Sequence, residues 1–179
     1  MKRSLLKLIE YSILPAIVLV LSKVGGIYLA AALFNIQVDL SASSSAFMFF
    51  ESAVAAKDIV IVSSYSDLFM FMGVALGMTI ILVQALYLHD SHVSPKMINE
   101  LAKRDLLSLI KSSFQLYHSG VIWLAFLWLA AIVILINAIN GMTDIWALAV
   151  SIIFTISYSI IFLKDLFTEI ELNKNGSNT

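Results

Sequence analysis

Lys23 is the residue of this sequence with the strongest claim to chemistry. It lies in an apolar stretch, eight residues after Pro15, hence ~12 Å into a helix that begins at the proline. A charged group at that depth costs ~2.5–3.5 kcal/mol and usually has a function. No acidic residue is expected at a similar depth on another predicted span, and Gln84 is the nearest strongly polar candidate. We therefore expect Lys23 to pair with an acid, a lipid phosphate or a cofactor from outside the chain, or else to snorkel toward an interface.

A second candidate group holds His89, Asp90, His92 and His118, at the predicted cytoplasmic ends of two spans. Imidazoles with a carboxylate can bind zinc or another transition metal, and His89 with His118 could grip a haem. The spacing matches no established ligand pattern. Solvated interfacial histidines are the common alternative, and a pH-responsive role is equally open.

Hydroxyl groups recur every four residues at Ser151, Thr155 and Ser159. On a helix this spacing puts them on one face, where they could line a polar path. More often such hydroxyls bond to the carbonyl four residues earlier or to a neighbouring helix.

Small residues form two further patterns. Gly73 and Gly77 make a GxxxG motif, and Ser22, Gly26 and Ala30 form a stripe on the first apolar stretch. Small residues let membrane helices approach closely. The patterns predict helix-packing surfaces, either toward another chain or, as we favour, between the first two spans of this one.

Catalytic motifs are not apparent. The chain has no cysteine, which excludes disulfides, thiolate metal sites and thiol catalysis. It has no HExxH, GxSxG or glycine-rich phosphate loop, and no TVGYG-type channel filter. An enzyme is therefore less expected than a non-catalytic protein.

The elements that must position these residues are membrane helices. The stretch 120–139 is twenty residues long and carries no charge, so as a helix it matches the ~30 Å hydrocarbon core. The whole chain is 60% hydrophobic and only 13% charged, against about 25% charged residues in soluble domains. Its mean hydropathy is +0.95. The sequence predicts an all-α integral membrane protein.

The predicted elements form one membrane domain over residues 1–179. Its four transmembrane helices cover about 15–34, 68–88, 120–139 and 145–163. The other predicted elements are a partly structured outer loop (35–66), a cytoplasmic amphipathic interfacial helix (95–117) and a disordered tail (172–179).

Within the outer loop, Ile36–Leu40 alternates apolar and polar residues and Asp58–Val62 is a β-branched run. Both patterns are typical of strands. They predict a small hairpin with a helical tip, and the alternative is an ordered loop that covers the bundle.

Basic residues predict the orientation. With both termini in the cytoplasm, nine of the eleven Lys and Arg residues fall inside, since only Lys57 is outside and Lys23 is buried. We expect an integral membrane protein, in the plasma (inner) membrane, with both termini cytoplasmic.

These patterns predict a non-catalytic subunit of a multi-subunit membrane complex that stabilises or scaffolds partner membrane helices. The alternative is a small homo-oligomeric transporter or channel. The expected partners are the bilayer and other membrane subunits or further copies of the chain. Nucleic acid is not expected, because no basic cluster is large enough. The sequence assigns no cofactor, and a bound lipid is compatible with it.

Overall fold

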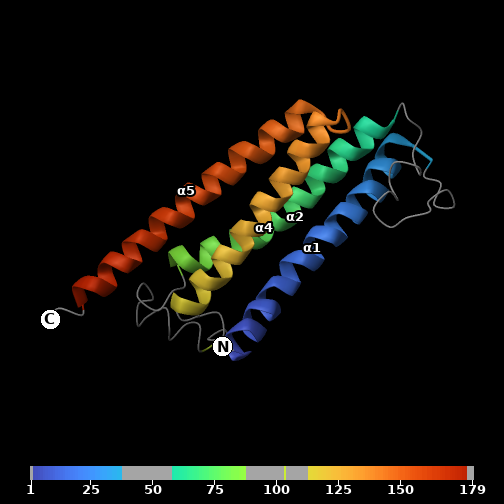
Figure 1. Ribbon diagram of the computed structural model, residues 1–179. Helices are drawn as coiled ribbons and strands as arrows, with labels where there is room; N and C mark the ends of the chain where they lie inside the picture. Colours follow the sequence, from blue (N-terminus) through green and yellow to red (C-terminus); the bar gives the residue numbers. More distant parts are fainter. Residues whose placement is uncertain (1, 38–57, 88–102, 104–112, 177–179) are drawn as a thin grey trace.

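The chain is described by a computed structural model, in which four long helices run through the molecule (Figure 1). The structure describes the backbone of residues 2–37, 58–87, 103 and 113–176. The helices are α1 (Lys2–Phe34), α2 (Ile59–Tyr87), α4 (Ser113–Ile139) and α5 (Ile145–Gly176). Each is long and apolar enough to cross a membrane, and the described residues contain no strand. The prediction of an all-α protein with four candidate membrane helices is confirmed.

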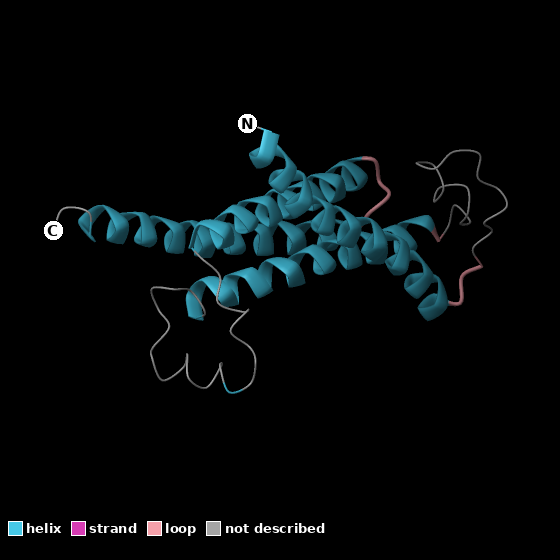
Figure 2. Cartoon of the chain, turned by 90° about the horizontal axis from the view of Figure 1, so that it is seen from below, coloured by secondary structure: helices cyan, strands magenta, loops and turns pink. Residues whose placement is uncertain are grey.

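Helices α2 and α4 form the centre of the bundle. Helix α1 packs mainly against α2 and α5 mainly against α4, so α1 and α5 flank the central pair (Figure 1). Their shared core includes the buried side chains Met78, Leu127 and Ile134. Figure 2 shows α1 running obliquely to the other helices, and both chain ends lie toward the same end of the bundle in Figure 1.

Helix α2 begins earlier than the sequence predicts. The run Asp58–Val62, predicted as a strand, is helical from Ile59 onward, and Val62 N already donates to Asp58 O at 3.1 Å. The strand prediction is wrong because β-branched side chains disfavour a helix only weakly. In lipid the backbone must bond to itself, and a helix does this within one segment.

Other helix ends also differ from the prediction. Pro15 was expected in a first helical turn, but it lies inside α1, which starts at Lys2. Residues 172–176, predicted as disordered tail, are the last residues of α5. Residues 113–117 belong to α4. The rest of the predicted amphipathic helix, except residue 103, and loop residues 38–57 lie outside the described residues.

Left-handed residues end two of the helices. Asn35 has a φ of 52°, and Ile36 N donates to Ala31 O at 2.9 Å. Gly141 has a φ of 72°, and Met142 N donates to Asn137 O at 2.9 Å. Both bonds span five residues, as in the Schellman motif that satisfies the last carbonyl groups of a helix. The second motif forms the turn between α4 and α5, which carries part of the site below.

Candidate functional site

The ammonium group of Lys23 pairs with the carboxylate of Asp67 on α2. The Asp67 side chain is fully buried, whereas that of Lys23 is 20% exposed. The expectation that no acid of this chain lies at a similar depth is therefore wrong. It failed because Asp67 was assigned to the start of the second span, whereas α2 begins eight residues earlier, at Ile59.

The second carboxylate oxygen of Asp67 accepts two further hydrogen bonds. Asn137, near the end of α4, donates from Nδ2 at 2.9 Å, and Thr143, in the α4–α5 turn, donates from Oγ1 at 2.5 Å. One buried carboxylate thus joins α1, α2, α4 and the turn. We call Lys23, Asp67, Asn137 and Thr143 the polar clamp.

Three serines of α2 extend the polar clamp. Ser66 Oγ donates to the backbone oxygen of Lys23 at 3.0 Å, and Ser63 Oγ lies 3.2 Å from Thr143 Oγ1. Ser64 Oγ accepts from the backbone N–H of Asp144 at 2.8 Å. Because a buried polar group is costly without a partner, the Ser63 and Ser64 contacts fix the α4–α5 turn against α2, and the Ser66 bond fixes α1 against α2.

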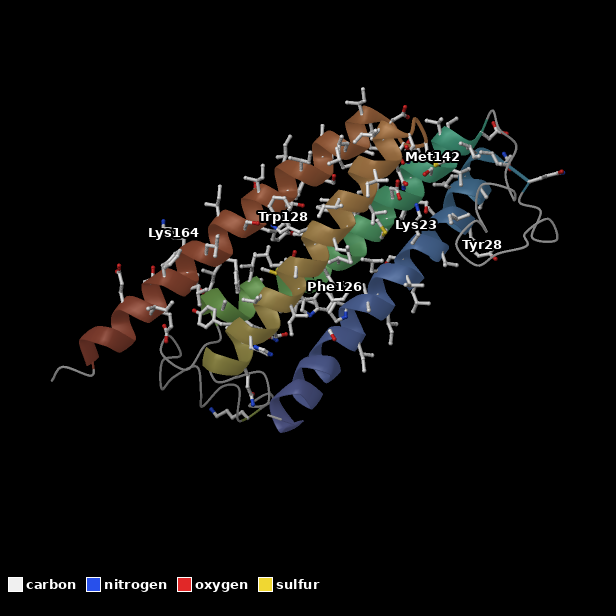
Figure 3. All side chains as sticks on the ribbon, viewed as in Figure 1. Lys23, Tyr28, Phe126, Trp128, Met142 and Lys164 are labelled. Atoms are coloured by element: carbon white, nitrogen blue, oxygen red, sulfur yellow. The ribbon has the colours of Figure 1, made fainter. Side chains whose placement is uncertain are left out.

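The polar clamp lies at the level of the α4–α5 turn, toward the end of the bundle opposite the chain termini. Figure 3 shows Lys23 and Met142 near each other at that end, while Lys164 lies toward the other end on α5. A charge pair whose hydrogen bonds are completed from neighbouring helices suits a structural role, since both Asp67 oxygens already have donors.

The predicted packing residues all lie at contacts within the chain. A Cβ atom on Gly73 would come within 2.1 Å of Ser22 Oγ, and one on Gly26 within 2.7 Å of Phe69 Cβ. Ala30 is fully buried. These contacts bring α1 and α2 together. Gly77 faces α4, where a Cβ atom would come within 1.9 Å of the Trp123 ring.

The hydroxyls predicted as a possible polar path bond mainly to their own helix. Ser151 Oγ donates to Leu148 O at 2.8 Å, Thr155 to Ser151 O at 2.7 Å, and Ser159 to Thr155 O at 2.7 Å. Ser159 Oγ also accepts from Trp128 Nε1 at 3.1 Å, which connects α5 to α4.

The described residues contain no group of three or more His, Cys, Asp or Glu side chains placed to hold a metal ion, and the structure describes one of the four predicted metal candidates. His118 lies half-buried on α4. His89, Asp90 and His92 fall outside the residues that the structure describes.

Gln84 lies apart from Lys23, in a groove between α1, α2 and α4. The groove has a volume of about 540 Å³, and Gln84 is part of its lining with Trp123 and several aliphatic side chains. The Oε1 atom of Gln84 is the single buried side-chain nitrogen or oxygen without a hydrogen-bond partner in the described part of the chain.

Three residues of the site were missed as members of it. Asn137 is the one strongly polar residue of the predicted span 120–139. Because a polar residue buried in lipid needs a partner, its position alone could have marked it as a hydrogen-bonding residue of the site. Asp67 and Thr143 gave no such signal, because both were expected at or outside the ends of spans.

Comparison with protein-family models, with characterised proteins and with solved structures finds no match to this chain. Its role is therefore argued from the geometry of the site.

Proposed function

We propose that this chain is a non-catalytic subunit of a multi-subunit membrane complex, in which its helices stabilise partner membrane helices. The observation that carries the non-catalytic part of the proposal is the polar clamp, whereas the subunit part rests on the exposed apolar faces of α1 and α5. The Lys23–Asp67 pair is completed by Asn137 and Thr143 of the same chain.

A pathway or a catalytic centre needs polar groups that can exchange partners with a substrate. In the polar clamp both Asp67 oxygens already accept hydrogen bonds. The α5 hydroxyls, Thr155 among them, bond to carbonyls of their own helix. The bonds of the polar clamp support a fixed frame, because each of them holds α2 against another helix or against the α4–α5 turn.

The flanking helices present the apolar faces that partners would contact. Large exposed side chains include Leu21 (65%) and Leu33 (63%) on α1, and Ile153 (64%) and Ile160 (61%) on α5. In lipid such faces associate by close packing rather than by the hydrophobic effect. Helices α1 and α5 therefore offer two separate surfaces to neighbours.

For location we propose the plasma membrane, with both termini on the cytoplasmic side, since that orientation retains most Lys and Arg residues inside. The chain lacks cysteine, so a single cysteine at Asn140 or at Thr179 can be labelled with a membrane-impermeant maleimide. In sealed cells we expect labelling at position 140 alone; labelling at position 179 alone would reverse the orientation.

Purification from native membranes in mild detergent tests the subunit role. We expect a tagged chain to elute with other membrane proteins at a fixed stoichiometry. Substituting Leu21→Trp or Ile153→Trp on an exposed face should release a partner without unfolding the chain, while Gly25→Ala, in open space, should not. Elution of the chain as a homo-oligomer that conducts ions or solutes in liposomes would contradict the proposal and favour a transporter.

A further inference from the structure

The groove between α1, α2 and α4 exists because α1 and α2 meet at one end and separate toward the other. At the clamp end, a Cβ atom on Gly26 would come within 2.9 Å of the Ser66 Cα. Figure 1 shows the N-terminal end of α1 well apart from the C-terminal end of α2. The separated part is lined by Leu14 and Val18 of α1 and by Leu76, Ile80 and Gln84 of α2.

The groove opens toward the surroundings of the bundle and is mostly apolar, with Gln84 and Ser119 as the polar side chains of its lining. Leu76 and Ile80 on its wall are 63% and 61% exposed. Its volume of about 540 Å³ lies in the range of ligand-binding sites, roughly 300–1,000 Å³.

The length and position of the groove match one leaflet of a bilayer. It extends along α2 from Gly73 to Gln84, eleven residues or ~16 Å, about half of the ~30 Å hydrocarbon core. Gln84 lies three residues before the end of α2 at Tyr87, so the polar end faces the membrane surface. The other end stops where Gly73 meets Ser22. A partner helix that crosses both leaflets would need a groove along the whole bundle, so this groove suits a lipid chain better than a helix.

The polar end carries an unsatisfied acceptor. Gln84 Oε1 is buried and has no hydrogen-bond partner among the described residues. Buried acceptors are nearly always bonded, and one without a donor is costly. The occupant of the groove should therefore bring an N–H or O–H group to this atom.

We propose that the groove binds an acyl chain of a phospholipid whose head group carries a hydrogen-bond donor. The acyl chain lies along Leu76 and Ile80 toward Gly73, and the Gln84 carboxamide turns into the groove so that its Oε1 atom accepts a hydrogen bond from the head-group ammonium or hydroxyl. This site is independent of the subunit role, because it requires no protein partner.

Tryptophan quenching by brominated lipids tests the proposal. Trp123 lines the groove and is only 7% exposed. In a Trp128→Phe/Trp146→Phe background it is the only tryptophan, since the chain has three. The probes are vesicles of phosphatidylcholine that contain a small fraction of brominated phosphatidylethanolamine or of brominated phosphatidylcholine. Phosphatidylcholine has no head-group N–H or O–H.

We expect brominated phosphatidylethanolamine to quench Trp123 with about fivefold higher apparent affinity, the factor that one net hydrogen bond supplies. Gln84→Leu should remove this preference, whereas Val83→Leu, on the neighbouring exposed residue, should keep it. A chain with Trp128 alone, 45% exposed, should be quenched equally by both lipids. Equal quenching of Trp123 by both lipids, or no quenching while Trp128 is quenched, would overturn the proposal.

Discussion

Removing both partners of the Lys23–Asp67 pair should destabilise the protein no more than removing one of them. Lys23→Met leaves a fully buried carboxylate with two neutral donors, Asn137 and Thr143. Asp67→Asn keeps a side-chain oxygen for those donors but leaves the ammonium without its counter-charge. Breaking a buried ion pair from one side costs about 3–5 kcal/mol. We expect ~3 kcal/mol for each single variant, the lower end of that range, because Lys23 is 20% exposed.

The double variant Lys23→Met/Asp67→Asn carries no charge at either position and retains an acceptor for Asn137 and Thr143. Replacing both charges of a buried pair is often nearly neutral. We expect the double variant to lose no more than ~3 kcal/mol of unfolding free energy, whereas additive effects would give ~6 kcal/mol. The difference, a coupling energy of ~3 kcal/mol, lies at the upper end of measured values.

The assay is reversible unfolding in lipid–detergent micelles titrated with sodium dodecyl sulfate, followed by circular dichroism. Lys164→Met is the matched control: this lysine is exposed on α5, so its removal should change the unfolding free energy by less than ~0.5 kcal/mol. Additive effects of the two single variants, or single variants as mild as the control, would show that Lys23 and Asp67 are not a coupled buried pair.

Three further predictions concern packing and use the same unfolding assay. Gly77→Ala should cost ~1–3 kcal/mol by overpacking, because its Cβ atom would come within 1.9 Å of Trp123. The control Gly25→Ala meets no atom within 4 Å and should not destabilise the protein. Equal effects of the two substitutions would contradict the close α2–α4 contact. Phe162→Ala should cost ~3–5 kcal/mol because Phe162 is fully buried. Phe167→Ala, at a residue that is 61% exposed, should leave the unfolding free energy nearly unchanged. An equally small effect of Phe162→Ala would contradict the packing of α5 against the core. Thr155→Val should cost under ~1 kcal/mol, because the Thr155 hydroxyl bonds to Ser151 O of its own helix. The same substitution should leave any flux through liposomes unchanged. A flux that disappears in Thr155→Val would instead favour a polar path along α5.

The candidate membrane helices could be predicted because apolar length is a strong signal in lipid. The stretches ending near residue 34 and covering 120–139 match the ends of α1 and α4. The start of α2 could not be read in the same way. A short β-branched run is typical of a strand in water, and only the absence of water makes it a helix.

That one boundary decided the interpretation of Lys23. With α2 starting at residue 68, Asp67 was expected outside the helix. With α2 starting at Ile59, it is a buried acid within a candidate membrane helix, paired with Lys23 of α1. Thr143 was equally out of reach of sequence patterns, because its contact depends on how the α4–α5 turn folds onto α2. Gln84 was identified from its polarity within an apolar span, but the groove around it depends on the divergence of α1 and α2.

Asp67 neutralises the charge of Lys23 within one chain, and solid-state NMR can detect this ion pair in a bilayer. The purified chain would be reconstituted into bilayers with ¹⁵N-lysine and ¹³C-aspartate, and dipolar recoupling would be measured between lysine Nζ and aspartate Cγ. We predict a recoupled pair at ion-pair contact, within ~4 Å, that disappears in Lys23→Met and in Asp67→Asn. A signal unchanged in both variants, or absent from the wild-type protein, would show that Lys23 and Asp67 do not form an ion pair.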